Sequence, residues 1–423
     1  MNLPLIPIFV PFCAALVCGC CAGDTPRPQG SDGLPTYSVS KLTSGPHHHF
    51  ASAYYHIRSW DSSGRYLLCL QTDIADRNPE VGDIATVGVI DVSGDGAFRP
   101  IAETRAWNFQ QGAMQQWLGS DPDSMVIFND FRDGEFVAVV ANAFTGQVDR
   151  IIPRPVSAIT RDGRYGVSIN FARLHRTRPG YGYPGPEQAA RLDESHPADD
   201  GLFHVDLTTG ESRLIVSLES VFRFNPPPDS AGKPFWFNHT LFSRDGSRVF
   251  FLGRYPKTGG GWHTASYTVG AGGDSLRCVL DYDWGGSHFD WLSDRRLLVT
   301  CYYQGTRPLA HLLFNDTPGQ QDREYRVLGR GMLIDDGHGR FSEDGRWMVT
   351  DTYPIRGNRS LMLMRMSDDV LMRLGTFNDH TENYTGPWRC DLHPAFDEAG
   401  GRIVFDSVDD GSRQIFLVEL SFN

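Results

Sequence analysis

A short unit that recurs along the chain constrains its fold more than any other feature. The clearest copy, Phe341–Thr350, has an aromatic residue before a polar cluster containing Asp344-Gly345, and apolar and β-branched residues after it. Glycine accepts the positive φ that a tight turn requires, and the flanking residues alternate as strands do, so the unit predicts a β-hairpin. Related units begin at Trp60, Trp117, Ile159, Phe242, Trp291 and Phe396, and the copy at Trp117 is the weakest.

The spacing of these units predicts a closed ring of small sheets. Most units begin roughly 40–55 residues apart, which is the length of a four-stranded propeller blade. The interval from Ile159 to Phe242 is about twice the shortest one, so we expect an insertion at about residues 171–235. The chain has 423 residues, but the uninterrupted repeats favour one large domain. The expected fold is all-β, a seven-bladed β-propeller in which the aromatic residues pack between neighbouring blades.

Both ends of the expected propeller, residues 35–423, have the alternation of a strand. These segments are residues 37–42 and residues 414–420. We expect the two strands to share one blade and close the ring, because closure removes open sheet edges. The preceding residues 24–34 contain several prolines and glycines and predict a flexible tether.

Residues 1–23 predict an export signal. A small residue precedes Cys20, as at a bacterial lipoprotein processing site, although the first residues carry no Lys or Arg. A plain cleaved signal is the alternative. A membrane-spanning anchor is disfavoured, because prolines interrupt a short apolar run. We therefore expect an exported monomer in the periplasm or on the outer membrane, where its only membrane attachment would be a lipid on Cys20.

The charge of the chain favours an acidic ligand that is not a nucleic acid. The formal net charge is −12, and no long basic tract is present. Lysine occurs only at positions 41, 233 and 257, so most cationic contacts would come from arginine. The planar guanidinium group binds carboxylate, sulfate or phosphate through two parallel hydrogen bonds.

Four consecutive units carry a histidine three residues before the aromatic residue. These histidines are His239, His288, His338 and His393. Equivalent positions of a closed ring converge on its axis, so we expect four imidazoles at one end of the channel. Neutral imidazole binds Zn²⁺, Mn²⁺ and similar ions, which predicts a divalent metal centre. The alternative is that each histidine bonds the backbone of a neighbouring blade.

The expected insertion contains the densest group of candidate catalytic residues. Residues 170–185 combine arginine, histidine and tyrosine with several Gly and Pro residues, which predicts a shaped loop and not a helix. A long loop on one face of a propeller is a common place for binding residues. A surface loop braced by cation–π contacts is the alternative. The candidates for proton transfer and for anion binding are Arg173, His175, Arg178, Tyr181 and Tyr183.

Two further segments supply candidate binding residues. Residues 47–49 are three adjacent histidines, and alternation along a strand lets only one or two of them face the axis, for which we favour His48 and His49. Asn129 and Arg132 stand where a strand of the second blade ends. A polar loop and an Asx-type turn with a solvated arginine are the respective alternatives.

The repeats resemble known propeller families. The His393-Pro394-Ala395-Phe396 and Phe341-Ser342-Glu343-Asp344-Gly345-Arg346 units are similar to the repeats of TolB-type propellers. The segments 391–394 and 402–407, with His48-His49-Phe50 before Trp60, resemble the seven-bladed polysaccharide lyases of the oligogalacturonate and ulvan types. The first type implies a histidine-bound divalent metal that binds a uronate carboxylate. The second implies His, Tyr and Arg chemistry, although the paired histidines of that type are absent near Gln110 and Asn129.

We therefore expect a polysaccharide lyase that cleaves a uronic-acid-containing polysaccharide or oligosaccharide by β-elimination. Such an enzyme must neutralise the carboxylate and place a base near C5. His175 or Tyr183 is the expected base, arginines 132, 173 and 178 would bind anionic groups, and the four histidines would hold Mn, Zn or Ca. The alternative is a non-catalytic TolB-like periplasmic propeller that acts as a binding or scaffold module. A glycoside hydrolase would require paired carboxylates, which nothing in the sequence selects.

Overall fold

The computed structural model describes residues 33–51, 54–55, 57–119, 124–302, 309–317 and 324–422. The chain divides into two compact units, residues 1–34 and 35–423, and the fold below is that of the second unit. The predicted export signal, Cys20 and most of the predicted tether lie outside the described residues. None of the described helices is long and apolar enough to cross a membrane.

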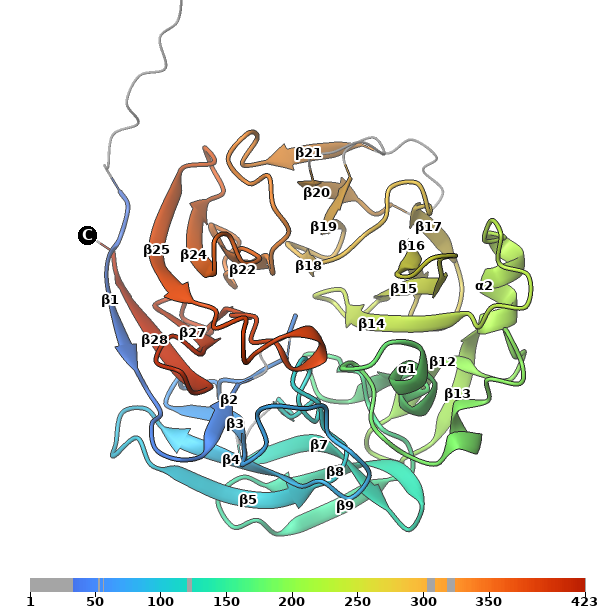
Figure 1. Cartoon of the computed structure of the whole chain (residues 1–423), viewed down its shortest axis with the longest axis horizontal. Coiled ribbons are helices and arrows are strands. Elements are labelled where there is room, and N and C mark those ends of the chain that lie inside the picture. Colours follow the sequence, from blue (N-terminus) through green and yellow to red (C-terminus); the bar gives the residue numbers. More distant parts are fainter. Residues whose placement is uncertain are drawn as a thin grey trace, which may run out of the picture. The chain divides into compact units, whose positions relative to one another are not determined.

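The second unit is a seven-bladed β-propeller, as predicted (Figure 1). Each blade is a four-stranded antiparallel sheet, and six blades follow the chain from the inner to the outer strand. The first three blades contain β2 (His48–Phe50), β3 (Tyr66–Thr72), β4 (Ala85–Asp91) and β5 (Phe98–Thr104); β6 (Gln116–Trp117), β7 (Met125–Arg132), β8 (Glu135–Asn142) and β9 (Val148–Ile152); and β10 (Ala158–Ile159), β11 (Tyr165–Ser168), β12 (Gly201–Asp206) and β13 (Ser212–Ser217).

The next three blades have the same order. They contain β14 (Trp236–Phe242), β15 (Arg248–Pro256), β16 (Trp262–Gly270) and β17 (Arg277–Leu280); β18 (Phe289–Trp291), β19 (Arg296–Tyr302), β20 (Leu309–Asn315) and β21 (Tyr325–Leu328); and β22 (Arg340–Phe341), β23 (Trp347–Asp351), β24 (Asn358–Arg365) and β25 (Leu371–Asn378). The helices are α1 (Phe171–Thr177) and α2 (Leu218–Phe224), with 3-10 turns η1 (Glu187–Ala190) and η3 (Gly386–Trp388).

The seventh blade joins the two ends of the propeller. It combines β26 (Ala395–Phe396), β27 (Arg402–Ser407) and β28 (Gln414–Ser421) with β1 (Thr36–Lys41) as the outermost strand. Thr36 lies opposite Ser421 and Lys41 opposite Phe416 in an antiparallel register. The prediction that both ends share one blade is therefore confirmed.

The repeated Asp-Gly unit forms the turn between the first and second strands of a blade. In three blades a hydroxyl donates to the Asp carboxylate two residues later, from Thr160 to Asp162 (2.6 Å), from Ser243 to Asp245 (2.7 Å) and from Ser342 to Asp344 (2.7 Å). The following glycine has a positive φ, for example 68° at Gly345. We call the end of the channel that these turns surround the hairpin-turn end.

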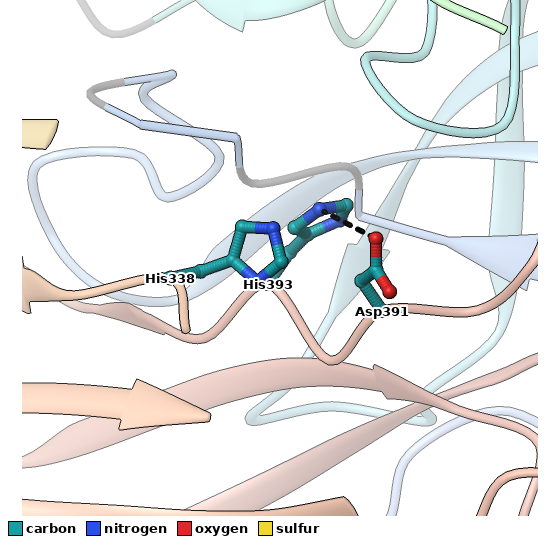
Figure 2. A group of neighbouring side chains, drawn as sticks. All are labelled: His338, Asp391 and His393. Atoms are coloured by element: carbon teal, nitrogen blue, oxygen red, sulfur yellow. Dashed lines mark ion pairs between the residues drawn. The ribbon is translucent and has the colours of Figure 1, made fainter. Parts of the chain in front are cut away.

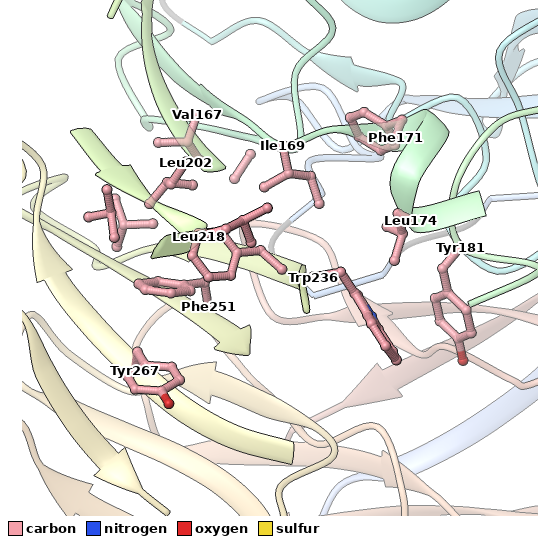
Figure 3. Packing of buried hydrophobic residues seen from close by; sticks show 14 of the residues in the cluster. Val167, Ile169, Phe171, Leu174, Tyr181, Leu202, Leu218, Trp236, Phe251 and Tyr267 are labelled. Carbon is pink, nitrogen blue, oxygen red and sulfur yellow. The ribbon is translucent and has the colours of Figure 1, made fainter. Parts of the chain in front are cut away.

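The core lies between the blades, where the aromatic residue of each unit packs. Phe341 of the sixth blade, for example, packs with Leu298 of the fifth and Met348 of the sixth. The largest cluster spans the third and fourth blades and includes Leu174 of α1 and Trp236 of β14 (Figure 3). This packing fixes each inner strand against its neighbours and so fixes the side chains at its two ends.

The predicted insertion differs from expectation in one respect. Residues 170–185 were expected to form a loop, but Phe171–Thr177 form the helix α1. Asn170 caps this helix by accepting a hydrogen bond from the backbone N–H of Arg173, and no Gly or Pro occurs before Pro179. The interval 171–235 also contains β12 and β13 of the third blade, so the additional residues flank these strands on both sides.

Candidate active site

The inner strands bring the repeated histidines to the opposite end of the channel, which we call the histidine end. His239 lies on β14, His288 directly precedes β18, and His338 and His393 each stand two residues before an inner strand. All four side chains are buried. The ring centroids of His288 and His338 are 3.9 Å apart, and those of His338 and His393 are 4.3 Å apart. Histidines of three consecutive blades are therefore in contact.

Tyr54 lies among these histidines and was not predicted. It comes from the segment between β2 and β3 of the first blade, and its ring centroid is 4.8 Å from that of His393 and 5.0 Å from that of His239. Its hydroxyl is 3.2 Å from Nε2 of His239, and the hydroxyl of Tyr55 donates to it at 3.0 Å. The other ring nitrogen of His239 faces Gln111 at 3.3 Å. Both nitrogens of His239 thus have polar neighbours within the protein.

A potential metal-binding group is formed by His338, Asp391 and His393 (Figure 2). One ligand atom from each residue lies within 4.8 Å of the others, and all three residues are buried. Nε2 of His338 and Nε2 of His393 are buried and have no hydrogen-bond partner among the described residues. Buried polar atoms normally have a partner. Two imidazole nitrogens and a carboxylate oxygen fit Mn²⁺ or Zn²⁺, whereas Ca²⁺ prefers oxygen ligands.

Neighbouring charges orient this group. Nδ1 of His338 lies 2.9 Å and 3.0 Å from the two oxygens of Asp351, which directs Nε2 toward His393. Burial opposes ionisation of Asp351, but His338 and Arg359 outweigh it and hold the pKa of this carboxyl well below its usual range. Asp391 is paired with Arg359 (2.8 Å) and Arg389 (2.7 Å), so its charge is balanced, although the buried Oδ2 atom has no well-aligned hydrogen bond.

His288 and His239 are placed differently from this group. Nδ1 of His288 lies 2.8 Å from Asp336, and its ring contacts His338. His239 is held by Tyr54 and Gln111. Of the four predicted metal ligands, His338 and His393 therefore belong to the group. His288 contacts the ring of His338, and His239 contacts the ring of Tyr54.

A cavity of about 630 Å³ opens beside these residues. Its size is in the range of pockets that hold small ligands. Its lining comes from the first blade, the insertion, the fourth to sixth blades and the segment between β25 and β26, and includes Tyr54, His239, His288, Trp262, Asp336 and Tyr353. The cavity therefore brings together side chains that are far apart in the sequence.

Three arginines give the cavity a positive wall. Arg178, Arg254 and Arg389 all line it. The guanidinium of Arg178 lies 3.7 Å from the centroid of Trp262, and its buried Nε has no hydrogen-bond partner among the described residues. Burial and the charge of Arg178 lower the pKa of Arg254 to about 10. Guanidinium groups in such an enclosed position favour a carboxylate ligand.

Tyr181 is the cavity residue with the most unusual environment. Its hydroxyl accepts a hydrogen bond from Nη2 of Arg389 at 2.8 Å, and Arg178 lies 4.5 Å from its ring centroid. Burial raises the pKa of Tyr181, but the positive charges of Arg389 and Arg178 outweigh burial, so the net pKa is lowered. A lowered pKa favours the phenolate form, which can accept a proton.

Comparisons with known proteins support the fold. An oligogalacturonate lyase in complex with manganese matches with a TM-score of 0.62, 16% identity and coverage of 92% of this chain and 96% of its own. The oligogalacturonate lyase from Vibrio parahaemolyticus matches with a TM-score of 0.61, 14% identity and coverage of 91% and 97%. The fold resembles that of the oligogalacturonate lyases. No family model and no curated protein sequence matches the chain.

The predicted resemblance is thereby confirmed at the level of the fold. TolB from Acinetobacter baumannii also matches, with a TM-score of 0.42, 12% identity and coverage of 84% of this chain and 80% of its own. At these identities the roles of individual residues must come from the geometry of this chain.

Arg173, a predicted catalytic residue, lies outside the cavity and holds the insertion together. It is 1% exposed, and its guanidinium donates to the backbone carbonyls of Phe235, Ala190, Arg191, Glu194 and Ser195. Hydrogen bonds of this kind order the segment between α1 and β14. This placement indicates a structural role, and the catalytic role stays a prediction without support from its position.

The other two predicted catalytic residues also do not line the cavity. Tyr183 is fully buried, stacks on Phe171 with a centroid distance of 4.5 Å, and accepts a hydrogen bond from Asn129 at 3.0 Å. Asn129, a predicted binding residue, is fully buried and also bonds both backbone groups of Val156. His175 is half-buried on α1. Of the candidates in the insertion, only Arg178 and Tyr181 reach the cavity.

The predicted binding residues of the first two blades, His48, His49 and Arg132, also do not line the cavity. His49 is buried between Gln414 (3.1 Å) and Gln71 (2.9 Å). Nδ1 of His48 accepts a hydrogen bond from the backbone of Arg413, and burial together with Arg413 lowers its pKa. Arg132 pairs with Asp130 at 2.7 Å. These contacts are structural, and no binding role follows from them.

The residues that the sequence did not reveal come from loops and from β15, the second strand of the fourth blade. Tyr54, Arg254, Arg389 and Asp391 could not be assigned from the repeat, because each lies outside the position that the units share. One signal was present for Tyr54. In the first blade the histidines precede Trp60 by many more residues than in the other blades, which indicates an additional segment near the axis.

Proposed function

We propose that the protein is a lyase that cleaves a uronic-acid-containing oligosaccharide or polysaccharide by β-elimination at the histidine end of the channel. The observation that carries the proposal is that two partnerless imidazole nitrogens lie beside Asp391, which an ion pair of 2.7 Å joins to Arg389 of the cavity wall. The resemblance to manganese-bound oligogalacturonate lyase in fold agrees with this proposal.

The reaction requires that the C5 proton of a uronate become more acidic. His338, Asp391 and His393 would hold a divalent cation, which would neutralise the substrate carboxylate as a Lewis acid. The arginines of the cavity wall bind the remaining anionic groups and orient the sugar. In this arrangement negative charge that develops on the carboxylate faces fixed positive charge.

We assign Tyr181 as the base that removes the C5 proton. Arg389 and Arg178 favour its ionised form, and its hydroxyl lies at the cavity. As the C5–H bond breaks, its electrons form the C4–C5 double bond and the bond from C4 to the glycosidic oxygen breaks. The leaving oxygen takes a proton, for which we assign the hydroxyl of Tyr54, backed by His239 at 3.2 Å.

An assay of the purified protein on oligouronides, with Mn²⁺ supplied, tests the proposal. The product of β-elimination is an unsaturated uronide that absorbs ultraviolet light. We expect absorbance to increase with at least one class among pectic, ulvan and glycosaminoglycan substrates. Binding of a uronide without any unsaturated product would contradict the proposal and favour the non-catalytic binding propeller. The predicted export, lipid anchor and monomeric state stay predictions.

A further inference from the structure

The hydroxyl of Tyr54 lies between two groups that can donate hydrogen bonds to it. The hydroxyl of Tyr55 donates to the Tyr54 oxygen at 3.0 Å, and Nε2 of His239 lies 3.2 Å from the same oxygen. A phenol has one proton to donate, and its oxygen can also accept hydrogen bonds. The direction of the bond to His239 therefore decides whether the proton of Tyr54 is available to a substrate.

Gln111 determines this direction, because it contacts the other ring nitrogen of His239. Burial and the charge of Arg254 lower the pKa of His239 well below its usual value, so the imidazole is neutral and has one donor and one acceptor nitrogen. The amide nitrogen of Gln111 lies 3.3 Å from Nδ1 of His239. An amide nitrogen only donates, so Nδ1 accepts and Nε2 of His239 carries the proton.

The observed orientation of the Gln111 amide is favoured over the reverse orientation. As observed, Oε1 of Gln111 is buried and has no hydrogen-bond partner among the described residues. Exchange of the two amide atoms would place the nitrogen, with its two protons, in that position. Buried donors without a partner are rarer than carbonyl oxygens without one. The Nε2–H form of His239 follows from the observed orientation.

The backbone at Tyr55 and His239 has an unusual conformation. Their φ angles are 52° and 51°, in the left-handed region that residues other than glycine rarely adopt. His239 also lies at a β-bulge, because the register between β14 and β15 shifts between Asn238 and Thr240. Bulges and strained residues are enriched at functional sites, where surrounding contacts hold them in place.

Contacts with distant segments hold Tyr55 and Gln111. The ring of Tyr55 stacks on Phe289 of the fifth blade, with a centroid distance of 3.8 Å. The backbone N–H of Gln111 donates to the side chain of Asn108 at 2.8 Å, and the amide of Asn108 donates to the carbonyl of Gly182 at 3.3 Å. The fifth blade and the insertion therefore help to fix the two residues.

Tyr55 and Gln111 line a different cavity from the proposed substrate site. Tyr54 and His239 line the cavity of about 630 Å³ at the histidine end. Tyr55 and Gln111 line a cavity of about 20 Å³, which Tyr54 also lines. Their side chains can therefore affect a substrate through Tyr54 without contacting it.

We propose that Tyr55 and His239 are positioning residues that direct the proton of Tyr54 into the large cavity, and that Gln111 contributes by fixing the tautomer of His239. This inference rests on the assignment of Tyr54 as the proton donor in the proposed function. When the proton passes to the leaving glycosidic oxygen, the electrons of the O–H bond stay on the Tyr54 oxygen. The two donors already point at this oxygen and stabilise its negative charge.

Nitrogen NMR of the full protein with isotope-labelled histidines tests the arrangement without a substrate, because the nitrogen shifts distinguish the two tautomers. We expect the Nε2–H tautomer for His239, whose signals are identified by their loss in His239→Gln and by their shift in Gln111→Met. Gln116→Met is the matched control and should leave these signals unchanged. Gln116 lines the same small cavity but donates to the carbonyl of Met114 at 3.3 Å. The Nδ1–H tautomer in the wild-type protein would overturn the proposal.

Kinetics on an oligouronide test the positioning role. Tyr55→Phe removes one donor to the Tyr54 oxygen, so kcat should fall about 10-fold or more while KM changes by less than about 2-fold. In a protein that already carries Tyr54→Phe, the same exchange should have no further effect, because the oxygen that accepts the bond is absent. A purely structural role of Tyr55 would lower kcat equally in both backgrounds.

Tyr384→Phe is the matched control for the loss of a tyrosine hydroxyl. The hydroxyl of Tyr384 donates to the carbonyl of Gly411 at 3.1 Å, and its loss should leave kcat unchanged. An unchanged kcat of Tyr55→Phe, or an equal fall in the Tyr54→Phe background, would overturn the positioning role.

The two measurements separate this inference from the proposed function. A protein without lyase activity in which His239 is the Nε2–H tautomer would refute the lyase and support the hydrogen-bond arrangement. Lyase activity together with the Nδ1–H tautomer would refute the arrangement alone.

Discussion

At the hairpin-turn end of the channel several blades finish their inner strands with nearly the same turn, whereas at the histidine end the repeated histidines have different partners. The turns at Asp162, Asp245 and Asp344 share one hydroxyl-to-carboxylate bond. At the other end, His239 faces Tyr54, His288 faces Asp336 and His338 faces Asp351. Regular turns keep the blades in register, and this regularity lets a few individual side chains meet in a chemical site.

The largest expected effect comes from the ligand group at the histidine end. His338→Ala removes one of the two partnerless imidazole nitrogens. Loss of a residue that only orients a metal ligand lowers metal affinity by about 10–100-fold, so loss of a ligand itself should lower bound metal and lyase activity by more than this. Elemental analysis and the absorbance assay measure the two effects. His204→Ala, on β12 and remote from the group, is the control. If the His338 variant kept its full metal content, His338 would not be a metal ligand.

Replacement of the assigned base should be the next largest effect. Tyr181→Phe keeps the ring but loses the hydroxyl, and we expect kcat to fall by about 10²–10⁴-fold while metal content is unchanged. Because the base acts when it is deprotonated, the wild-type rate should fall as pH decreases through the lowered pKa of Tyr181. The variant should lack this acidic limb. A variant with the wild-type pH profile would show that another group removes the proton.

Loss of the carboxylate that orients His338 should have an intermediate effect on metal affinity. Asp351→Asn keeps the size of the side chain but removes the charge that holds Nδ1 of His338. We expect metal affinity to fall by about 10–100-fold, without loss of the fold. Competition with a chelator of known affinity measures this change, and a normal unfolding temperature excludes general damage. An unchanged affinity would mean that packing alone orients the imidazole.

A cation of the cavity wall should affect substrate binding more than chemistry. Arg178→Gln removes a guanidinium that stacks on Trp262, and we expect KM to rise by about 10-fold or more while kcat changes little. Arg176→Gln, two residues away and outside the cavity lining, is the matched control. Steady-state kinetics of both variants on the same oligouronide separate an effect on KM from an effect on kcat. Equal kinetics would indicate that substrate does not reach this wall.

The smallest expected effect comes from glycines in the turns at the two ends of the channel. Gly163 has a φ of 66°, and a Cβ there would lie 2.0 Å from the carbonyl oxygen of Leu118. Gly411, between β27 and β28, has a φ of 88° and no atom within 4 Å of such a Cβ. Gly163→Ala should therefore destabilise the protein by about 1–3 kcal/mol more than Gly411→Ala, as measured by denaturant unfolding. Equal destabilisation would show that the turn of the third blade is not tightly packed.

The sequence predicted the scaffold well because the scaffold is repetitive. Turn chemistry and aromatic spacing recur at Phe242, Trp291, Phe341 and Phe396, so each copy supports the others. The shared histidine position could be predicted for the same reason. Arg173 could not be interpreted in this way, because burial decides whether an arginine binds substrate or backbone, and burial depends on segments as distant as Phe235. Tyr54 and Arg389 were missed because contacts between blades bring them to the axis.

The pairing of β1 with β28 has a consequence for biosynthesis. Among the described strands, β1 is synthesised before all the others, and its blade partners β26–β28 are synthesised after them. Until β26–β28 emerge, β1 has no neighbour, and the first and seventh blades cannot pack together. A product that stops before β26 would thus expose sheet edges, so synthesis of the seventh blade is coupled to assembly of the candidate metal centre.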